Sequence, residues 1–248
     1  MAYDLYDDLA RRYDLSFWRF DEHDPLEVEF FRKLFSDNKV HYVLDCACGT
    51  GRHLHLFHSL GCEVFGSDVS ESMLAQAHEN LAEQGVQMPL VQADYRELPQ
   101  HFRRYFEAVV CMNSIGYMPN EEEFLRAFTS MRGILCEGGV LVLTTTPTDK
   151  QWKEKRRFIL NANREDFSRL FVIDYLEHTA RYNVVDIFHS EEANELKVWS
   201  SDLHVLLRDD QERLLKEAGF RTVDFYGTFD FEPYNKETSG RLITMAHK

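Results

Sequence analysis

Short apolar runs alternate with segments of helical periodicity along the first part of the chain. Five of these runs have the length and composition of buried strands: residues 42–44, 63–67, 89–93, 108–112 and 140–145. Helical segments lie before and between them, at residues 3–13, 25–35, 52–60, 71–83 and 120–133. Because strands that alternate with helices pair in parallel through right-handed crossovers, the pattern predicts an α/β domain around a mostly parallel sheet.

The pattern changes after Pro147. Between residues 158 and 207, apolar and polar positions alternate in the runs F-V-I-D-Y, Y-N-V-V-D-I-F and L-K-V-W-S-S-D-L-H-V-L-L, which is typical of antiparallel strands. A helix follows at 209–218, and runs at 221–226 and 241–246 predict an antiparallel pair that closes the main sheet.

These elements predict a Rossmann-like α/β fold with helices on both faces of its sheet. The expected sheet has seven strands and is mostly parallel with an antiparallel last strand, and a small antiparallel β insertion follows its fifth strand. We expect a helical N-terminal cap at 1–37, a core formed by 38–149 and 208–248, and a β-rich insertion at 150–207 that covers the substrate.

Polar residues end the first four predicted strands. Residues 43–53 read V-L-D-C-A-C-G-T-G-R-H, so the first strand ends at Asp45 and the chain turns through Gly49 and Gly51 into a helix. Glycines permit positive φ and close approach of a ligand to the backbone. The next three strands end at Asp68, Asp94 and Asn113. Because the carboxyl ends of parallel strands meet at one edge, where open α/β sheets bind nucleotides, these side chains should converge on one ligand.

Two classes of ligand fit such an edge. A dinucleotide site would have a third glycine after G-T-G for tight packing around a pyrophosphate, but Leu54 stands there. The form D-x-A-C-G-T-G, with the acidic strand ends that follow it, instead resembles the class I S-adenosylmethionine-dependent methyltransferases, whose sulfonium ligand carries no phosphate. The resemblance covers about residues 38–146 and implies S-adenosylmethionine as the cofactor.

The resemblance also implies roles for individual residues. Asp45 would lie near the ammonium group of the cofactor, Asp68 would bind the ribose, and Asp94 would accept from the adenine amino group. The other residues implied at the cofactor are Tyr13, Ala47, Gly49, Gly51, Val69, Met73, Tyr95, Met112, Asn113 and Tyr117. Structural alternatives stay open: Asp94 could cap the following turn, and Met73 and Tyr117 could be core residues.

Three short segments are similar to small-molecule N-methyltransferases of the glycine/sarcosine type and the sugar N,N-dimethyltransferase type. They are Y-D-D-L-A-R-R-Y-D at 6–14, C-M-N-S-I-G-Y-M at 111–118 and F-E-P-Y-N at 231–235. Tyr6 shares one helical face with Tyr13 and is a further candidate for contact with the cofactor. On the substrate side, the resemblance implies Tyr13, Asn113, His204, Tyr234 and Arg241, and it leaves the catalytic residue unassigned.

One departure from the glycine type concerns the acceptor. That type has an arginine just after the fifth strand to hold the substrate carboxylate, whereas this chain has T-T-T-P-T at 144–148. Threonines do not replace a bidentate guanidinium. Glycine is therefore not the expected acceptor unless Arg156, Arg157 or Arg241 reaches the site.

Charge and composition exclude several classes of partner. A formal net charge of −14 over 248 residues offers no basic surface for phosphates, so we expect no nucleic-acid partner. The chain has five cysteines, including a C-x-C at 46–48, but no second Cys/His pair at zinc-finger spacing, so we expect buried thiols and no metal. No apolar run is long enough to cross a membrane and no signal-like N-terminus is present, so we expect a cytoplasmic protein without a membrane partner.

The sequence thus predicts an S-adenosylmethionine-dependent methyltransferase that acts on a small molecule, with nitrogen as the expected acceptor atom. A small-molecule O-methyltransferase is the nearest alternative. A non-catalytic S-adenosylmethionine-binding or regulatory protein is an alternative of another class, because a fold does not determine a function. The identity of the acceptor, the general base and the oligomeric state stay open.

Overall fold

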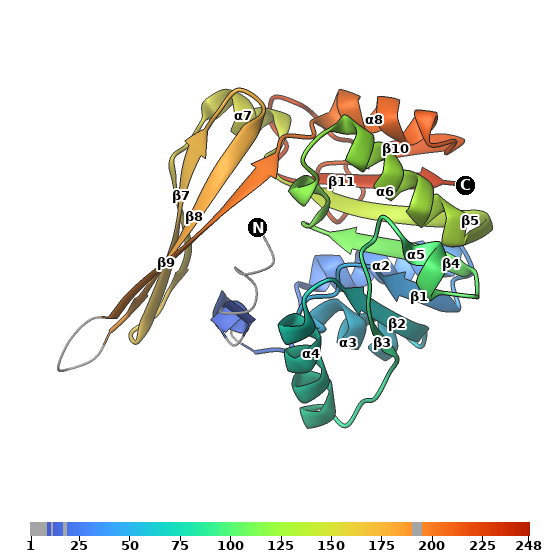
Figure 1. Cartoon of the computed structure of the whole chain (residues 1–248), viewed down its shortest axis with the longest axis horizontal. Helices are drawn as coiled ribbons and strands as arrows, with labels where there is room; N and C mark the ends of the chain where they lie inside the picture. The colour runs from blue at the N-terminus through green and yellow to red at the C-terminus, as the bar shows by residue number, and fades with distance from the viewer. Residues whose placement is uncertain (1–8, 11, 17–18, 190–194) are drawn as a thin grey trace.

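The computed structural model describes residues 9–10, 12–16, 19–189 and 195–248, and over these residues the strands form two sheets (Figure 1). The larger sheet has seven strands in the order β10-β11-β5-β4-β1-β2-β3. Their bounds are β1 (Tyr42–Asp45), β2 (Glu63–Asp68), β3 (Leu90–Gln92), β4 (Phe106–Met112), β5 (Leu135–Thr145), β10 (Thr222–Tyr226) and β11 (Leu242–His247). β11 is antiparallel to both of its neighbours, whereas β5, β4, β1, β2 and β3 pair in parallel. The predicted main sheet is therefore confirmed.

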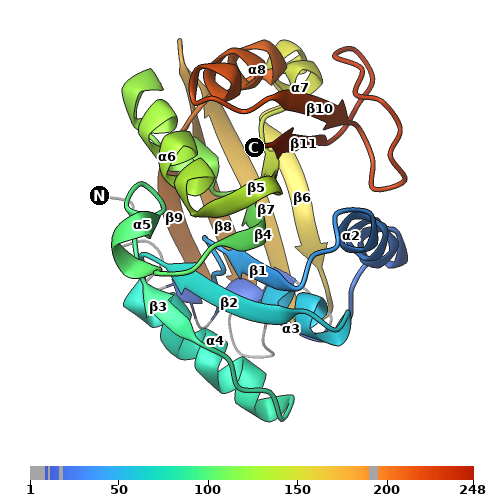
Figure 2. The same cartoon turned by 90° about the vertical axis from the view of Figure 1, so that its right-hand side faces the viewer.

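Helices cover both faces of this sheet (Figures 1 and 2). One face packs against α2 (Pro25–Asp37), α3 (Arg52–Ser59) and α4 (Glu71–Glu83), and the other against α5 (Leu98–His101), α6 (Glu121–Ile134) and α8 (Arg208–Glu217). β4 shows why its run is apolar without a break. Its successive side chains point to opposite faces of the sheet. Ala108 and Val110 pack on the side of α2, α3 and α4, and Val109 and Cys111 pack on the side of α5, α6 and α8, so all four are buried.

The helix starts follow the capping chemistry of the sequence. Ser70 accepts a hydrogen bond from a backbone N–H in the first turn of α4 at 3.2 Å, and Asn120 does the same for α6 at 3.0 Å. Serine and asparagine are among the residues most favoured at this position, so both helix starts can be read from the sequence. The short helices α5 and α7 (Asp149–Glu154) are absent from the prediction, although Thr148 and Gln151 form a capping box at the start of α7 that the sequence T-D-K-Q encodes.

The second sheet is antiparallel, in the order β6-β7-β8-β9. Its strands are β6 (Phe158–Asn163), β7 (Phe167–Tyr175), β8 (Thr179–Phe188) and β9 (Glu195–His204). The predicted insertion after the fifth strand is confirmed, and its named runs correspond to β7, β8 and β9. In Figure 1 this sheet stands to the left of the main sheet, with the blue N-terminal segment between them.

Part of the predicted N-terminal helix is described. Residues 9–10 and 12–13 are helical and lead into the 3₁₀ turn η1 (Asp14–Ser16), whereas Tyr6 lies outside the described residues. Leu9 packs with Val184 and Trp199 of the second sheet. None of the helices in the described part of the chain combines the length and the hydrophobicity that a membrane crossing requires.

Candidate functional site

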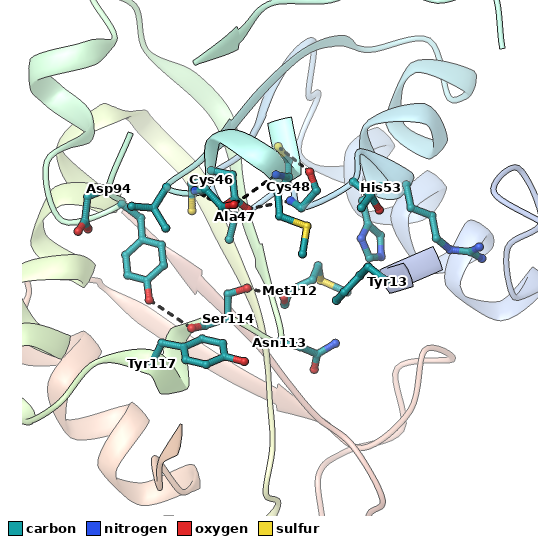
Figure 3. Close-up of a pocket in the computed structure, with 18 of the residues that line it drawn as sticks. Tyr13, Cys46, Ala47, Cys48, His53, Asp94, Met112, Asn113, Ser114 and Tyr117 are labelled. Atoms are coloured by element: carbon teal, nitrogen blue, oxygen red, sulfur yellow. Dashed lines mark hydrogen bonds between the residues drawn. The ribbon is translucent and has the colours of Figure 1, made fainter. Parts of the chain in front are cut away.

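A cavity of about 660 Å³ lies where β1, β2 and β4 end, and its volume is in the range usual for small-molecule sites (Figure 3). Figure 3 shows side chains from the turn after β1, from the end of β4 and from the N-terminal segment around it. The residues that the sequence predicts and that line this cavity are Tyr13, Ala47, Gly49, Asp68, Val69, Met73, Asp94, Tyr95, Met112, Asn113, Tyr117 and Arg241. Of the four strand-end residues, Asp68, Asp94 and Asn113 therefore share one space and Asp45 does not line it, and the roles of all four stay predictions.

The turn after β1 is built around the Asp68 carboxylate. Gly49 N–H donates to one oxygen of Asp68 at 2.9 Å, and Ser70 N–H donates to the other at 3.0 Å. Gly49 has φ +52°, a backbone conformation that favours glycine. Burial raises the pKa of Asp68, although these backbone hydrogen bonds oppose the shift. Each carboxylate oxygen has two lone pairs, so Asp68 can still accept from a ligand hydroxyl.

Two predicted cofactor residues lie just behind the lining. Asp45 is buried, with one oxygen accepting from Ala47 N–H at 3.2 Å and the other without a partner among the described residues. Burial raises the pKa of Asp45 to about 6, against the opposing effect of nearby His53. Gly51 has φ +89°, and a Cβ there would lie 3.2 Å from Ala77 Cβ, so this glycine permits the turn and its close packing on α4.

Asp94 lines the cavity with its carboxylate already engaged. It accepts from Arg96 Nε and from Arg96 N–H, both at 2.9 Å, and Arg96 also pairs with Glu123. Burial alone would raise the pKa of Asp94, but the Arg96 guanidinium outweighs burial and lowers it. The hydrogen bond from Arg96 N–H to Asp94 caps the turn after β3, which is the structural role that the sequence analysis left open for Asp94. An adenine amino group would have to share this carboxylate with Arg96.

The end of β4 presents Met112, Asn113 and Tyr117 along one side of the cavity (Figure 3). Asn113 has φ +53°, a conformation that asparagine tolerates better than most residues, and its N–H donates to Thr144 Oγ1 at 3.0 Å. This contact ties the turn after β4 to β5. On the neighbouring side, the Tyr95 hydroxyl donates to the Ser114 carbonyl at 3.2 Å.

The two cysteines of the turn are part of the wall. Cys46 and Cys48 flank Ala47, line the cavity and have free thiols. Burial raises the pKa of both thiols, so they stay neutral and behave as small apolar side chains. Of the other cysteines, Cys62 and Cys111 are buried and Cys136 is partly exposed.

Two residues proposed for the substrate side do not line this cavity. The His204 ring packs edge-on against Phe124 at 5.5 Å between centroids. The Tyr234 hydroxyl donates to the Asp149 carboxylate at 2.8 Å and accepts from Asp149 N–H at 3.0 Å, so it ties the last loop to the start of α7. Each of these contacts fits a structural role, and the substrate-side roles of both residues stay predictions.

A charged group of residues that sequence reasoning missed also lines the cavity, and one of its members, His53, lies opposite Asp94 in Figure 3. The group consists of Asp24, Glu27, Arg52 and His53, together with the predicted Arg241. His53 Nε2 lies 3.3 Å from Glu27 Oε1, and both side chains are largely buried. Burial opposes ionisation of Glu27, but the hydrogen bond to His53 and nearby positive charges outweigh burial and lower its pKa. The sequence signal was the His in G-T-G-R-H, but its partner comes from the preceding helix.

Of the three arginines that the sequence offered for the substrate carboxylate, Arg241 reaches this cavity. Its guanidinium lies over the Phe229 ring at 4.7 Å and makes no ion pair with any residue in the described part of the chain. Arg156 and Arg157 do not line the cavity, and they pair with Glu154 and Asp174.

Comparisons with known proteins agree with this architecture. The model of a methyltransferase domain family matches residues 43–139. The glycine/sarcosine N-methyltransferase of Aphanothece halophytica is 28% identical over 227 residues, which is 90% of this chain and 82% of that protein. The dTDP-3-amino-3,4,6-trideoxy-alpha-D-glucopyranose N,N-dimethyltransferase of Streptomyces venezuelae is 38% identical over 102 residues, 41% of this chain and 40% of that protein.

Among solved structures, an S-adenosylmethionine-dependent methyltransferase from Clostridium acetobutylicum superposes with a TM-score of 0.82 at 17% identity and covers 98% of both chains. That likeness concerns the fold, whereas the domain match and the curated relatives concern the sequence. Together with the cavity at the strand ends, they show a methyltransferase domain at residues 43–139 in a chain that is similar to S-adenosylmethionine-dependent methyltransferases.

Proposed function

We propose that this methyltransferase binds S-adenosylmethionine and a small amine on opposite sides of one cavity and methylates the amine nitrogen. The observation that carries the proposal is that one cavity is lined by two sets of residues: strand-end residues such as Asp68 and Asp94, and the charged group with Glu27, His53 and Arg241. Figure 3 shows Asp94 and His53 at opposite sides of the cavity.

The residues at and next to the strand ends fit the cofactor. Asp68 has spare lone pairs for two ribose hydroxyls, and the turn at Gly49 leaves backbone accessible where a Cβ would project. Asp45 has a buried oxygen without a partner among the described residues, which supports a role beside the positive ammonium group. When bound, S-adenosylmethionine supplies a methyl group on a sulfonium centre, whose sulfur keeps the electron pair of the broken C–S bond.

The chain itself contributes orientation and proton transfer. Tyr13, Met112 and Tyr117 line the same cavity and would exclude water around the acceptor. An amine acceptor loses one proton for each methyl group that it gains. His53 Nε2 lies 3.3 Å from the Glu27 carboxylate. In the neutral tautomer that donates Nε2–H to this carboxylate, the lone pair is on Nδ1, which can take the proton of the amine and pass it to water.

Arg241 supports an acceptor that carries an anionic group as well as an amine. A guanidinium without an ion pair, packed on an aromatic ring, is suited to bind a carboxylate or a phosphate. The acceptors named for the two relatives, glycine or sarcosine and a dTDP-linked amino sugar, are both amines with such a group. Arg241 would then take the place of the arginine that is missing after β5.

Two measurements test the proposal. Calorimetric titration with S-adenosylhomocysteine should show binding in the micromolar range, and folded protein that shows none would overturn the cofactor assignment. Methyl transfer is then measured over a panel of small amines, with and without a carboxylate or phosphate, and over matched alcohols. Turnover of alcohols alone would identify an O-methyltransferase, and binding without any turnover would favour a non-catalytic protein.

A further inference from the structure

The insertion sheet contains a buried ion pair that faces the N-terminal segment. Arg169 in β7 and Asp186 in β8 are directly opposite each other in the antiparallel register. Arg169 donates to Asp186 through Nε at 2.6 Å and through a terminal nitrogen at 2.7 Å, and the side chains are 3% and 0% exposed. Burying a charge is costly even when it is paired, so this arrangement calls for a reason beyond stability.

The outer nitrogens of the same guanidinium reach the N-terminal segment. They donate to the carbonyl of Tyr13 at 3.3 Å and to the carbonyl of Arg12 at 3.0 Å. A guanidinium has five N–H donors in a rigid fork, so Arg169 can hold a carboxylate on one edge and two backbone carbonyls on the other. The position of this backbone is therefore set by a residue of the second sheet.

The opposite side of the segment is attached to the cofactor turn. Asp14 accepts from Thr50 Oγ1 at 2.6 Å and from Asn80 Nδ2 at 2.7 Å, and Asn80 also donates to the Thr50 carbonyl at 3.0 Å. Thr50 stands between the two glycines of that turn. The backbone at Tyr13 is thus held by Arg169 of the insertion, the next residue is held by the cofactor turn and α4, and the Tyr13 side chain lines the cavity.

The insertion itself contributes little lining. Among the described residues that line the cavity, none belongs to residues 150–207. The hydrogen bonds from Arg169 to the backbone are therefore a route by which the insertion can affect the site.

We propose that Arg169 is a positioning residue of the cofactor site, which holds Tyr13 in place against bound S-adenosylmethionine. The proposal rests on the proposed contact between Tyr13 and the cofactor, and it makes the insertion a part of the cofactor site. Without these two backbone bonds, Tyr13 would have to be ordered when the cofactor binds, and the affinity would fall by the cost of that ordering.

The test is a double-mutant cycle on the binding of S-adenosylhomocysteine. Lysine at 169 keeps a positive charge beside Asp186, but a single ammonium cannot reach both the carboxylate and the two carbonyls. R169K should weaken binding about tenfold, which corresponds to the loss of about two hydrogen bonds of ordinary strength. In a Y13A background, R169K should cause no further loss, because the residue through which Arg169 acts is gone.

A matched control comes from the same sheet. Arg181 pairs with Asp202 at 2.7 Å between β8 and β9, and the two side chains are 49% and 48% exposed. R181K should leave the affinity unchanged. The paired variant R169M/D186L removes the anchor without leaving a buried charge alone, and it should show the same loss and the same dependence on Tyr13 even where R169K fails to fold.

Two results would overturn the proposal. One is an affinity that both Arg169 variants leave unchanged, and the other is a loss that is equally large with and without the Tyr13 side chain. The test measures binding of S-adenosylhomocysteine and does not depend on the acceptor. If the protein methylates no amine, the proposed acceptor is refuted, but the role of Arg169 can still be tested.

Discussion

The ion pair between Arg169 and Asp186 also gives a stability prediction whose size follows from burial. D186N keeps the shape of the side chain but leaves the guanidinium of Arg169, which is 3% exposed, without its counter-charge. Removing one partner of a buried ion pair typically costs about 3–5 kcal/mol, because the remaining charge stays desolvated. D202N breaks a pair of the same type at a half-exposed position, where water and salt screen the charges, and should cost about 0–1 kcal/mol.

Chemical and thermal unfolding of the three proteins measures this difference. For a domain of this length, 1 kcal/mol corresponds to roughly 2–4 °C in the melting temperature, so D186N should melt about 6–20 °C below the wild type. D202N should stay within about 4 °C of the wild type. The paired change R169M/D186L should recover most of the loss, because apolar side chains of similar volume replace a buried ion pair at little cost.

Equal shifts for D186N and D202N would refute this reasoning, since burial would then make no difference to the value of the pair. A paired variant as unstable as D186N would also contradict it. The loss would in that case come from disrupted packing around β7 and β8, and not from the unpaired charge.

Four further predictions concern the cavity. The pKa of Asp45 rises from 3.8 to about 6 in the fold, so the protein without ligand should lose stability as the pH rises from about 4 to about 6. In thermal unfolding over a pH series, D45N should therefore have a higher melting temperature than the wild type at pH 7 and the same melting temperature below pH 4. D68A should weaken the binding of S-adenosylhomocysteine by more than about 100-fold in calorimetry, since it removes hydrogen bonds to a charged group. D94A should weaken binding less, because the Asp94 carboxylate is already engaged by Arg96. H53N should lower kcat/KM for amines, and the difference in kcat/KM from the wild type should shrink at high pH, where the acceptor loses its proton in solution. The control H41N alters the exposed pair of His41 with Glu63 and should match the wild type at every pH. R241Q should raise the KM of acceptors that carry a carboxylate or phosphate and leave S-adenosylhomocysteine binding unchanged in calorimetry, and an equal KM change for uncharged amines would argue against its role.

Much of the fold could be predicted because its signals are local. A strand buried on both faces reads as an unbroken apolar run, as in β4, and a helix start shows its cap, as Ser70 does for α4. The polar residues at the strand ends followed from the same reasoning, since parallel strands bring their carboxyl ends to one edge. The short helices α5 and α7 were missed because each has too few residues for a clear helical period. The strand β6 was missed because its residues F-I-L-N-A-N do not alternate between apolar and polar, and most of them are exposed.

The sequence by itself therefore determined the alternation of elements, the main sheet, and the set of strand-end residues that share one cavity. The tertiary structure decided the rest. It paired His53 with Glu27, placed Arg96 between the carboxylates of Asp94 and Glu123, and brought Arg169 to the backbone of Tyr13. Such contacts join residues from different elements, and they depend on how helices and sheets pack against one another. Periodicity reports which face of an element is buried, but it does not report which residue of another element that face will meet.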